Sequence, residues 1–274
     1  MTAPVVRIRP FGPGSAGAAA VLLTLLLAGC AVDTRGVVDD APEEPRTAGA
    51  AAPRTPTAPQ GPAASPGAGA EPAEPAPGID LSAHSTSDPA SPWVVVNKHT
   101  PLDPLDHEPE LTVVRGYLVR LDAAPDIGAL LDAADADGVH LTLRSAYRGY
   151  PKQEQVYEGW VAQLGRAGAD EMSARPGHSE HQTGTAVDVG SSTRPGCDFK
   201  PCFGDTVEGR WVAEHAAEFG LVVRYTAENS TVTGYGPESW HLRWVGRDLA
   251  AHLRATGVTT LEEVFDVPGG GYVD

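Results

Sequence analysis

From residue 93 onward, apolar and polar positions repeat with the periods of both strands and helices. Short apolar runs predict strands at 94–96, 111–114, 139–143, 185–189, 221–225 and 240–245. Helical spacing predicts helices over 127–134, 150–164 and 208–219, and another from the last strand through residue 254. Helices and strands do not alternate regularly enough for a doubly wound parallel sheet. We therefore expect an α+β fold with a small, mostly antiparallel sheet flanked by helices.

Three residues mark the ends of the predicted helices. Asp126 is a candidate cap at the start of the first helix, and Pro151 lies in the first turn of the second. Gly220 follows the third and predicts its end.

The first 29 residues have the pattern of an export signal. Arg7 and Arg9 supply positive charge, and the apolar run over 18–27 is too short to span a bilayer, which needs about 20 residues. The Leu-Ala-Gly-Cys motif that ends at Cys30 resembles a bacterial lipobox, in which the cysteine is lipidated and becomes the mature N-terminus. We predict a lipoprotein signal peptide over 1–29 and an extracytoplasmic protein whose lipid at Cys30 anchors it to the cell membrane. An ordinary signal peptide with an incidental cysteine is the alternative.

Residues 30–92 have the composition of an extended linker. The segment 31–92 contains 12 of the 25 prolines, nine acidic and three basic residues, and almost no aromatic or large aliphatic side chains. Such a segment cannot bury enough apolar surface to offset its loss of conformational entropy. All five tryptophans lie beyond it, the first at Trp93. We therefore predict a disordered tether over 30–92 and one monomeric globular domain over 93–274.

The charge balance limits the possible partners. The chain carries 20 Lys and Arg against 36 Asp and Glu, which gives a net charge of −16. A duplex-binding protein needs a basic surface that neutralises phosphates. The composition therefore argues against nucleic acid as a partner.

Cys197 and Cys202 remain once Cys30 is assigned to the membrane anchor. An exported protein can hold a disulfide, and this pair would close a short loop. A metal site is the alternative, but it would need two more soft ligands at short spacing, and the sequence has none there. We predict a disulfide between Cys197 and Cys202.

A candidate metal site combines residues that lie far apart in the sequence. His181 is in a polar, glycine-containing stretch that runs into a short apolar strand with one aspartate, Asp188. If that aspartate is buried, it needs a partner or a metal. Together with His241, these residues would supply two imidazoles and one carboxylate with an open fourth position, as in catalytic zinc sites. Zinc would lower the pKa of a bound water from about 16 to about 7. A hydrogen-bonded structural His–Asp pair is the alternative.

A hydrolytic metal site also needs a general base, and Glu238 is the candidate. It precedes His241 by three positions, an offset that places two side chains on opposite faces of a regular strand. Convergence therefore requires the turn at Gly236-Pro237 to bend Glu238 back toward the metal. A serine mechanism is excluded, because its Ser-x-x-Lys motif needs a serine three residues before a lysine, and no lysine of this chain has one.

Three sequence blocks resemble the VanY-type D-alanyl-D-alanine carboxypeptidases, which belong to the zinc metallopeptidase group of lysostaphin, D-Ala-D-Ala peptidases and hedgehog-like domains. The blocks are Ser145-Ala146-Tyr147-Arg148 with Gln153, then Pro176-Gly177-His178-Ser179-Glu180-His181 through Asp188, and Glu238-Ser239-Trp240-His241. Their order and spacing agree over about residues 93–265. Gly149, where serine is common, and Ser239, where proline often stands, are the two departures from the family pattern.

The resemblance implies both the chemistry and the substrate. His181, Asp188 and His241 would be the ligands of Zn²⁺. Glu238 would take a proton from the attacking water and return it to the leaving amine. The implied activity is removal of the terminal D-alanine from peptidoglycan stem peptides that end in D-Ala-D-Ala.

The resemblance also implies how the substrate is held. Arg148 would stabilise the developing oxyanion or bind the terminal carboxylate. Gln153 and Ser179 match family positions that contact the peptide.

Several activities remain compatible with the sequence. A related L,D-carboxypeptidase or a peptidoglycan endopeptidase would share the fold, because bond choice depends on pocket dimensions and on how the terminal carboxylate is held. A zinc-stabilised module that binds cell-wall peptide without cleaving it is a further alternative. Glu238 distinguishes this module from an enzyme, because a binding module needs no base beside the metal.

Overall fold

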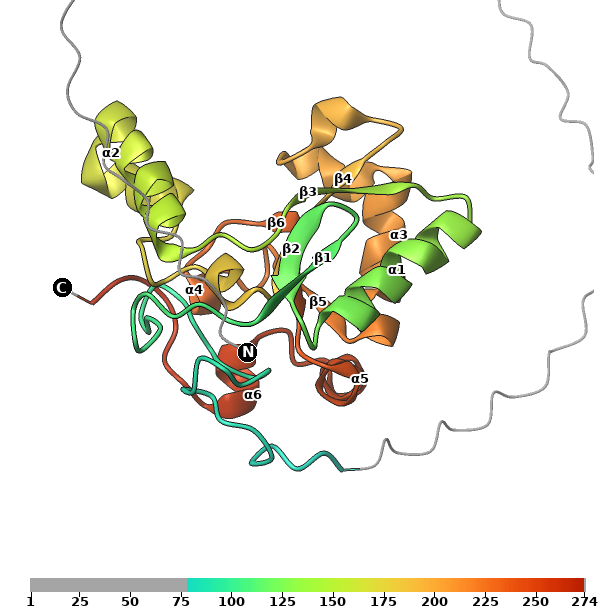
Figure 1. Cartoon of the computed structure of the whole chain (residues 1–274), viewed down its shortest axis with the longest axis horizontal. Coiled ribbons are helices and arrows are strands. Elements are labelled where there is room, and N and C mark those ends of the chain that lie inside the picture. The colour runs from blue at the N-terminus through green and yellow to red at the C-terminus, as the bar shows by residue number, and fades with distance from the viewer. Residues whose placement is uncertain (1–77, 274) are drawn as a thin grey trace, which may run out of the picture. The chain divides into compact units, whose positions relative to one another are not determined.

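A computed structural model describes residues 78–273, and a four-stranded antiparallel sheet of order β3-β4-β6-β5 forms its centre (Figure 1). Strands β1 and β2 form a separate antiparallel hairpin. The strands are β1 (Leu111–Val114), β2 (Tyr117–Arg120), β3 (Leu141–Ser145), β4 (Ala186–Ser191), β5 (Leu221–Tyr225) and β6 (Glu238–Trp244). The helices are α1 (Ala124–Ala136), α2 (Tyr150–Met172), α3 (Val207–His215), α4 (Ser230–Thr233), α5 (Arg247–Thr256) and α6 (Leu261–Phe265). The expected α+β fold is confirmed.

The main core lies between the sheet and the helices α1 and α3 (Figure 1). In β4, Val187 and Val189 are buried in this core. Full burial of such an aliphatic side chain contributes about 1.5–3 kcal/mol. Since neighbouring side chains of a strand point to opposite faces, the same alternation turns Asp188 away from the core. The apolar pattern of β4 thus determines which way the candidate ligand faces.

One predicted strand is absent, and one strand was not predicted. Val94, Val95 and Val96 are buried but unpaired with any strand of the described chain. Val95 N–H donates to the Thr86 carbonyl, and the Val94 carbonyl accepts from the Arg243 guanidinium. Their apolar pattern therefore reflects burial alone. Strand β2 was missed, although Gly116 with a φ of 88° makes the tight hairpin turn before it.

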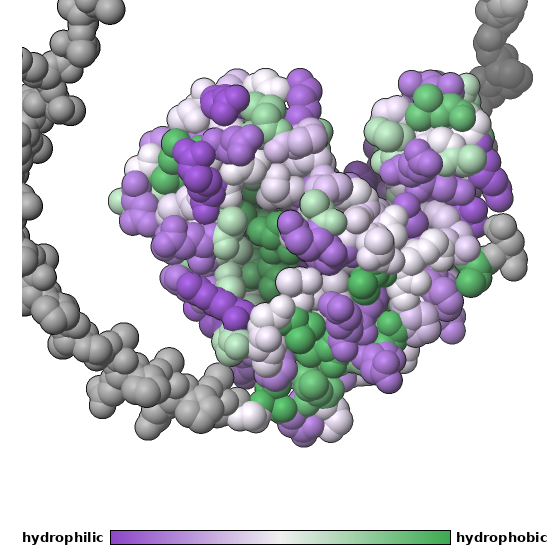
Figure 2. Space-filling view, turned by 180° about the vertical axis from the view of Figure 1, so that it is seen from behind, coloured by the Kyte–Doolittle hydropathy of each residue, from purple (hydrophilic) through white to green (hydrophobic). Residues whose placement is uncertain are grey.

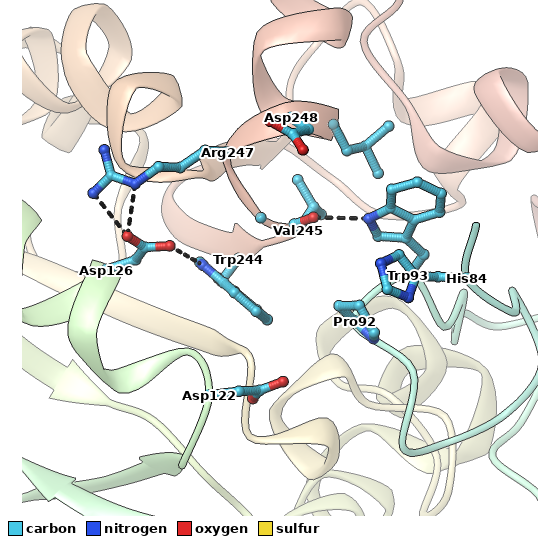
Figure 3. Close-up of a pocket in the computed structure, with 11 residues that line it drawn as sticks. His84, Pro92, Trp93, Asp122, Asp126, Trp244, Val245, Arg247 and Asp248 are labelled. Carbon is cyan, nitrogen blue, oxygen red and sulfur yellow. Dashed lines mark hydrogen bonds and ion pairs between the residues drawn. The ribbon is translucent and has the colours of Figure 1, made fainter. Parts of the chain in front are cut away.

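Asp126 does not cap α1. The cap position is Ala123, and no side-chain hydrogen bond is made there. The Asp126 carboxylate instead accepts from Trp244 Nε1 at 2.9 Å and Arg247 Nε at 2.8 Å (Figure 3). These bonds tie α1 to the end of β6 and to the start of α5, beside a pocket of about 470 Å³. This pocket contains none of the predicted catalytic residues.

The folded domain begins earlier than composition predicts. Residues 78–92, which we assigned to the tether, are part of it: Ile79 and Leu81 pack on the cluster around Trp93, and the Ser91 carbonyl accepts from Arg120. The predicted signal peptide, Cys30 and the rest of the tether lie outside the described residues. Within 78–273, no helix has the length and apolar character needed to cross a membrane.

Helix α2 extends beyond its predicted end and is set off from the sheet (Figure 1). It begins with Pro151 in its first turn, as predicted, and is interrupted at Gly165, where φ is 72°. In the view from behind, α2 forms a lobe separated from the rest of the domain by a notch (Figure 2). Helix α3 and the short 3₁₀ turn after it end at Gly220, whose φ of 76° agrees with the predicted stop.

Candidate metal and catalytic site

The three predicted metal ligands converge at the centre of the sheet. Strands β4 and β6 pair with Asp188 directly opposite His241. His181 lies in a 3₁₀ turn over Glu180–Thr183, just before β4. That turn ends at Gly184 with a φ of 69°, where a Cβ atom would lie only 3.0 Å from the backbone nitrogen of Arg120. Glycine is therefore required at the residue that leads His181 into the strand.

The donor set fits a tetrahedral metal ion. His181 Nε2 lies 3.1 Å from Asp188 Oδ2, and His241 Nδ1 lies 3.1 Å from Asp188 Oδ1. One ligand atom from each residue lies within 4.8 Å of the others. Zinc bonds of 2.0–2.1 Å place neighbouring ligands of a tetrahedral site about 3.3 Å apart. Two imidazoles and one carboxylate therefore stand at spacings that a single zinc ion would need little movement to bridge.

The electrostatics of the site favour a cation. Burial alone would raise the pKa of Asp188, but the two imidazoles outweigh it and hold that pKa well below its usual range. Burial lowers the pKa of His181. It would also lower that of His241, yet hydrogen bonds to Asp188 and Glu180 raise the His241 pKa to about 10. The carboxylates thus draw positive charge to the point where the ligands meet.

Each histidine has a second partner that orients its ring. His181 Nδ1 lies 2.8 Å from the Ala146 carbonyl, so it must carry the proton it donates and leave Nε2 free to bind a metal. His241 Nε2 lies 3.1 Å from Glu180 Oε2, so this carboxylate holds the Nε2 proton, and Nδ1, which faces Asp188, is the nitrogen that a metal ion would bind after displacing its proton. Glu180 is therefore a positioning residue for His241.

Glu180 belongs to a buried ionic network that sequence reasoning missed. Its carboxylate accepts from Arg224 Nε at 2.8 Å and lies 3.3 Å from Arg243 Nη1. Arg224 Nη2 in turn donates to Glu262 of α6. Burial would raise the pKa of Glu180, but the two guanidinium groups hold it far below its usual value. The available signal was an arginine inside each of the apolar strands β5 and β6, because a buried charge requires a partner.

Glu238 reaches the same pocket as His241 because β6 is irregular. Val223 pairs with Leu242 but Tyr225 pairs with Glu238, so three residues of β6 lie opposite the single residue Arg224. An insertion of this kind breaks the regular alternation of side chains and re-aims them. The sequence argument assigned this convergence to the turn at 236–237, and the shifted register shows that the strand itself contributes. Burial raises the pKa of Glu238, although His241 partly offsets it.

Arg148 lines the pocket and is held from behind by Gln153. Arg148 Nε donates to Gln153 Oε1 at 2.6 Å. The amide nitrogen of Gln153 donates to Ser173 Oγ and to the Ala174 carbonyl, and the side chain is fully buried. Gln153 thus positions Arg148, and its predicted contact with the peptide stays a prediction. Ser179 lines the pocket beside the metal ligands, as a substrate-contacting residue requires.

The pocket has a volume of about 660 Å³, with a polar floor and apolar walls. The floor contains the three ligands, Glu238 and Arg148. The walls contain aromatic and aliphatic side chains, among them Val156, Trp160, Met172, Phe199 and Trp240. The predicted disulfide is present, with the Cα atoms of Cys197 and Cys202 5.3 Å apart, and it closes the loop that carries Phe199.

Comparison with known proteins identifies similar chains. The family model described as "VanY: D-alanyl-D-alanine carboxypeptidase" matches residues 117–247, a segment that contains the three ligands, Glu238 and Arg148. The protein YodJ of Bacillus subtilis is 38% identical over 148 residues, which is 54% of this chain and 54% of YodJ. The chain thus spans about half the length of this curated relative.

Solved structures match over more of their length. The LdcB LD-carboxypeptidase is 33% identical with a TM-score of 0.61, and the match covers 66% of this chain and 89% of LdcB. A mutant of the vancomycin resistance D,D-pentapeptidase VanY, in complex with Zn(II), is 32% identical with a TM-score of 0.54. That match covers 62% of this chain and 96% of the VanY chain. The fold and the zinc-type site therefore have counterparts among known peptidases.

Proposed function

Because the chain belongs to the VanY family of D-alanyl-D-alanine carboxypeptidases, we propose that it is a zinc-dependent carboxypeptidase that removes the terminal D-alanine from peptidoglycan stem peptides. One observation carries the proposal: two imidazoles and a carboxylate meet on the floor of a pocket that also contains a buried glutamate and an arginine. A zinc-stabilised binding module has no need of Glu238 beside the metal.

The residues of the pocket divide the reaction between them. His181, Asp188 and His241 would hold the zinc ion, which supplies Lewis-acid activation of a water molecule at neutral pH. Glu238 accepts a proton from the attacking water and delivers it to the leaving amine of D-alanine. Arg148, fixed by Gln153, presents its guanidinium to the developing oxyanion or to the terminal carboxylate.

An L,D-carboxypeptidase is a second candidate, and a specific observation supports it. LdcB, an LD-carboxypeptidase, is among the solved structures that this chain resembles. The two activities differ in the stereochemistry of the residue that precedes the scissile bond. The same zinc ligands and base would serve both, so the walls of the pocket decide between them.

We also propose that the domain works outside the cell, on a membrane to which Cys30 is anchored by lipid. The export signal and the Leu-Ala-Gly-Cys motif support this location, and peptidoglycan is the substrate available there. Substitution of Cys30 by Ala should abolish incorporation of a labelled fatty acid into the protein, without changing the activity of the folded domain.

Product analysis by mass spectrometry tests the proposed function. The zinc-loaded chain is incubated with a pentapeptide ending in D-Ala-D-Ala and, separately, with the tetrapeptide that lacks the last residue. We expect loss of one alanine from the pentapeptide and none from the tetrapeptide, and no product after chelation. Cleavage of the tetrapeptide alone would identify an L,D-carboxypeptidase, and an internal cut would identify an endopeptidase.

Substitution of the base tests the assignment of Glu238. We expect Glu238→Gln to lower kcat by about 10²–10⁴-fold, because the proton acceptor is lost while the shape of the side chain is kept. Zinc content and melting temperature should not change. Glu228→Gln, at an exposed glutamate outside the pocket, is the matched control. A Glu238→Gln enzyme with normal turnover would refute the assignment.

A further inference from the structure

The loop between β4 and α3 is fastened to the sheet at several points. The Cys197–Cys202 disulfide closes it. Between the cysteines, Asp198 Oδ2 lies 2.6 Å from Arg144 Nε of β3, and Asp198 Oδ1 accepts from the Ser191 backbone N–H at 2.9 Å. The Asp198–Arg144 ion pair lies over Gly190, where a Cβ atom would come within 2.8 Å of the Asp198 carboxylate. The contacts of Asp198 thus hold the loop on the sheet, and the disulfide limits the conformations of the loop itself.

Phe199 is the residue that this loop presents. It lies directly after Asp198, and its backbone φ is 56°, a value that is rare for residues other than glycine, asparagine and aspartate. The residue is 50% exposed, and its ring packs edge-on against Trp240, with ring centroids 6.1 Å apart. A backbone conformation of this kind persists only where the surroundings impose it. Here the disulfide and the Asp198 contacts impose it, and the result is a large apolar side chain held open to solvent at the pocket.

Helix α2 supplies the facing wall of the pocket. Trp160 and Met172 of α2 line the same pocket as Phe199, and Met172 is 55% exposed. The loop and α2 are separate parts of the chain that flank the sheet (Figure 1). By contrast, the metal ligands on the floor are only 3–5% exposed. Because Phe199 and Met172 are half-exposed and the metal ligands are buried, we place these two apolar side chains at the mouth of the pocket and the reacting groups at its bottom.

This arrangement determines which part of a substrate meets Phe199. A carboxypeptidase binds the last two residues of the peptide at the floor, on either side of the scissile bond. The chain that precedes them must leave through the mouth, past the aromatic side chains. We propose that Phe199 is a specificity-determining residue that, with Trp240 and Trp160, binds the apolar or aliphatic part of the peptide residue before the last two. The Cys197–Cys202 disulfide keeps it in place. The inference rests on the proposed function and deepens it.

Two substrates of different length test the role of Phe199. With the zinc-loaded full chain, Phe199→Ala should raise KM about five- to tenfold for the pentapeptide ending in D-Ala-D-Ala, as expected for loss of an aromatic contact. KM for N-acetyl-D-Ala-D-Ala, which does not extend to the mouth, should stay within twofold. Values of kcat and zinc content should not change for either substrate. An equal rise in KM for the two substrates, or an unchanged KM for the pentapeptide, would overturn the proposal.

Matched variants isolate the contribution of the loop. Val207 is 51% exposed, follows the same loop and lies outside the pocket lining, so Val207→Ala should leave both KM values unchanged. The double variant Cys197→Ser/Cys202→Ser should raise KM for the pentapeptide in the same direction as Phe199→Ala, with zinc content retained. An unchanged KM in the double variant would overturn the role of the disulfide.

Calorimetric binding keeps this test separate from the proposed function. To prevent turnover, both proteins carry Glu238→Gln. The single variant Glu238→Gln and the double variant Glu238→Gln/Phe199→Ala are each titrated with the pentapeptide and with N-acetyl-D-Ala-D-Ala. Weaker binding of the pentapeptide alone in the variant that lacks Phe199 supports the contact. The same pentapeptide Kd in the two proteins contradicts it. A parent chain that binds the pentapeptide but cleaves nothing would contradict the proposed activity and leave the contact with Phe199 supported.

Discussion

Glu180 acts on the metal site through the ring of His241. Its carboxylate faces His241 Nε2, so it fixes the tautomer in which Nδ1 is available for zinc. Arg224 and Arg243 contact the same carboxylate, and all of these groups are buried. A buried charge that loses its partner is strongly destabilising. One side chain therefore supports both the geometry of a ligand and the stability of the domain.

The substitution Glu180→Gln should weaken zinc binding by about 10–100-fold, because an amide no longer holds the His241 tautomer in place. It should also lower the free energy of unfolding by about 3 kcal/mol, because the two buried arginines lose a counter-charge. Competition with a chelator measures the first effect and denaturant unfolding the second. Glu214→Gln, at a glutamate whose side chain is 74% exposed, should change neither. Parent-like zinc affinity in Glu180→Gln would contradict the positioning role.

Residue patterns predicted some of these roles and not others. Asp188 between two valines predicted a carboxylate turned away from the core, and the structure confirms it. The partners of Glu180 could not be predicted, because Arg224 and Arg243 lie 44 and 63 positions away in the sequence and no local period connects them. The roles of Arg148 and Gln153 came from family resemblance, since a lone arginine or glutamine has no distinctive local pattern.

At the scale of elements, α3 is tied to the end of β4 by Glu208. Its fully buried carboxylate accepts from Ser191 Oγ at 2.8 Å, and from the backbone N–H and the hydroxyl of Thr193. Burial would raise the pKa of Glu208, but these hydrogen bonds outweigh it and lower the pKa from 4.5 to about 2. The start of the disulfide loop thus depends on an ionised glutamate.

This contact gives the stability a defined pH dependence. Since the folded pKa is lowered, the unfolded chain takes up its proton first as pH falls, and the stabilisation is complete above about pH 5 and lost progressively toward pH 2. The full effect is of the order of 3 kcal/mol. Urea unfolding between pH 6 and pH 3 should show that the parent loses more stability than Glu208→Gln does. If the free energy of unfolding falls equally with pH in the parent and in Glu208→Gln, the contribution of Glu208 is contradicted.

Element boundaries followed the apolar pattern only where strands pair in the sheet. The run at 221–225 coincides with β5, whereas the equally apolar Val94–Val96 lies buried in a segment whose hydrogen bonds go to a turn and to Arg243. Apolar content reports burial, and pairing depends on partners elsewhere in the chain. The irregularity that re-aims Glu238 in β6 leaves no local pattern either, because it arises from the register with β5.

On the scale of the whole molecule, the folded unit includes residues that composition assigned to the tether. Prolines recur up to residue 92 and large apolar side chains stay rare, yet Ile79 and Leu81 pack on the domain and His84 stacks edge-on against Trp93. Two isolated aliphatic residues do not form a period, so only the structure reveals that this segment is folded.

Two truncated chains test this boundary. A chain that begins at residue 93 should be less stable than one that begins at residue 78, by about 3 kcal/mol, because Ile79 and Leu81 and the acceptor for Arg120 at Ser91 are removed. The chain from residue 78 should retain full activity on the pentapeptide. Thermal unfolding monitored by circular dichroism measures the difference. Equal melting temperatures of the two chains would contradict the boundary at residue 78 and support the one at residue 93 that composition predicts.

The central claim is that His181, Asp188 and His241 bind one zinc ion. Anomalous diffraction at the zinc edge, from crystals of the zinc-loaded chain, tests it most directly. We predict a single peak about 2.0–2.2 Å from His181 Nε2, from a carboxylate oxygen of Asp188 and from His241 Nδ1. A peak at another place, or these three side chains turned away from one another in the presence of zinc, would contradict the account.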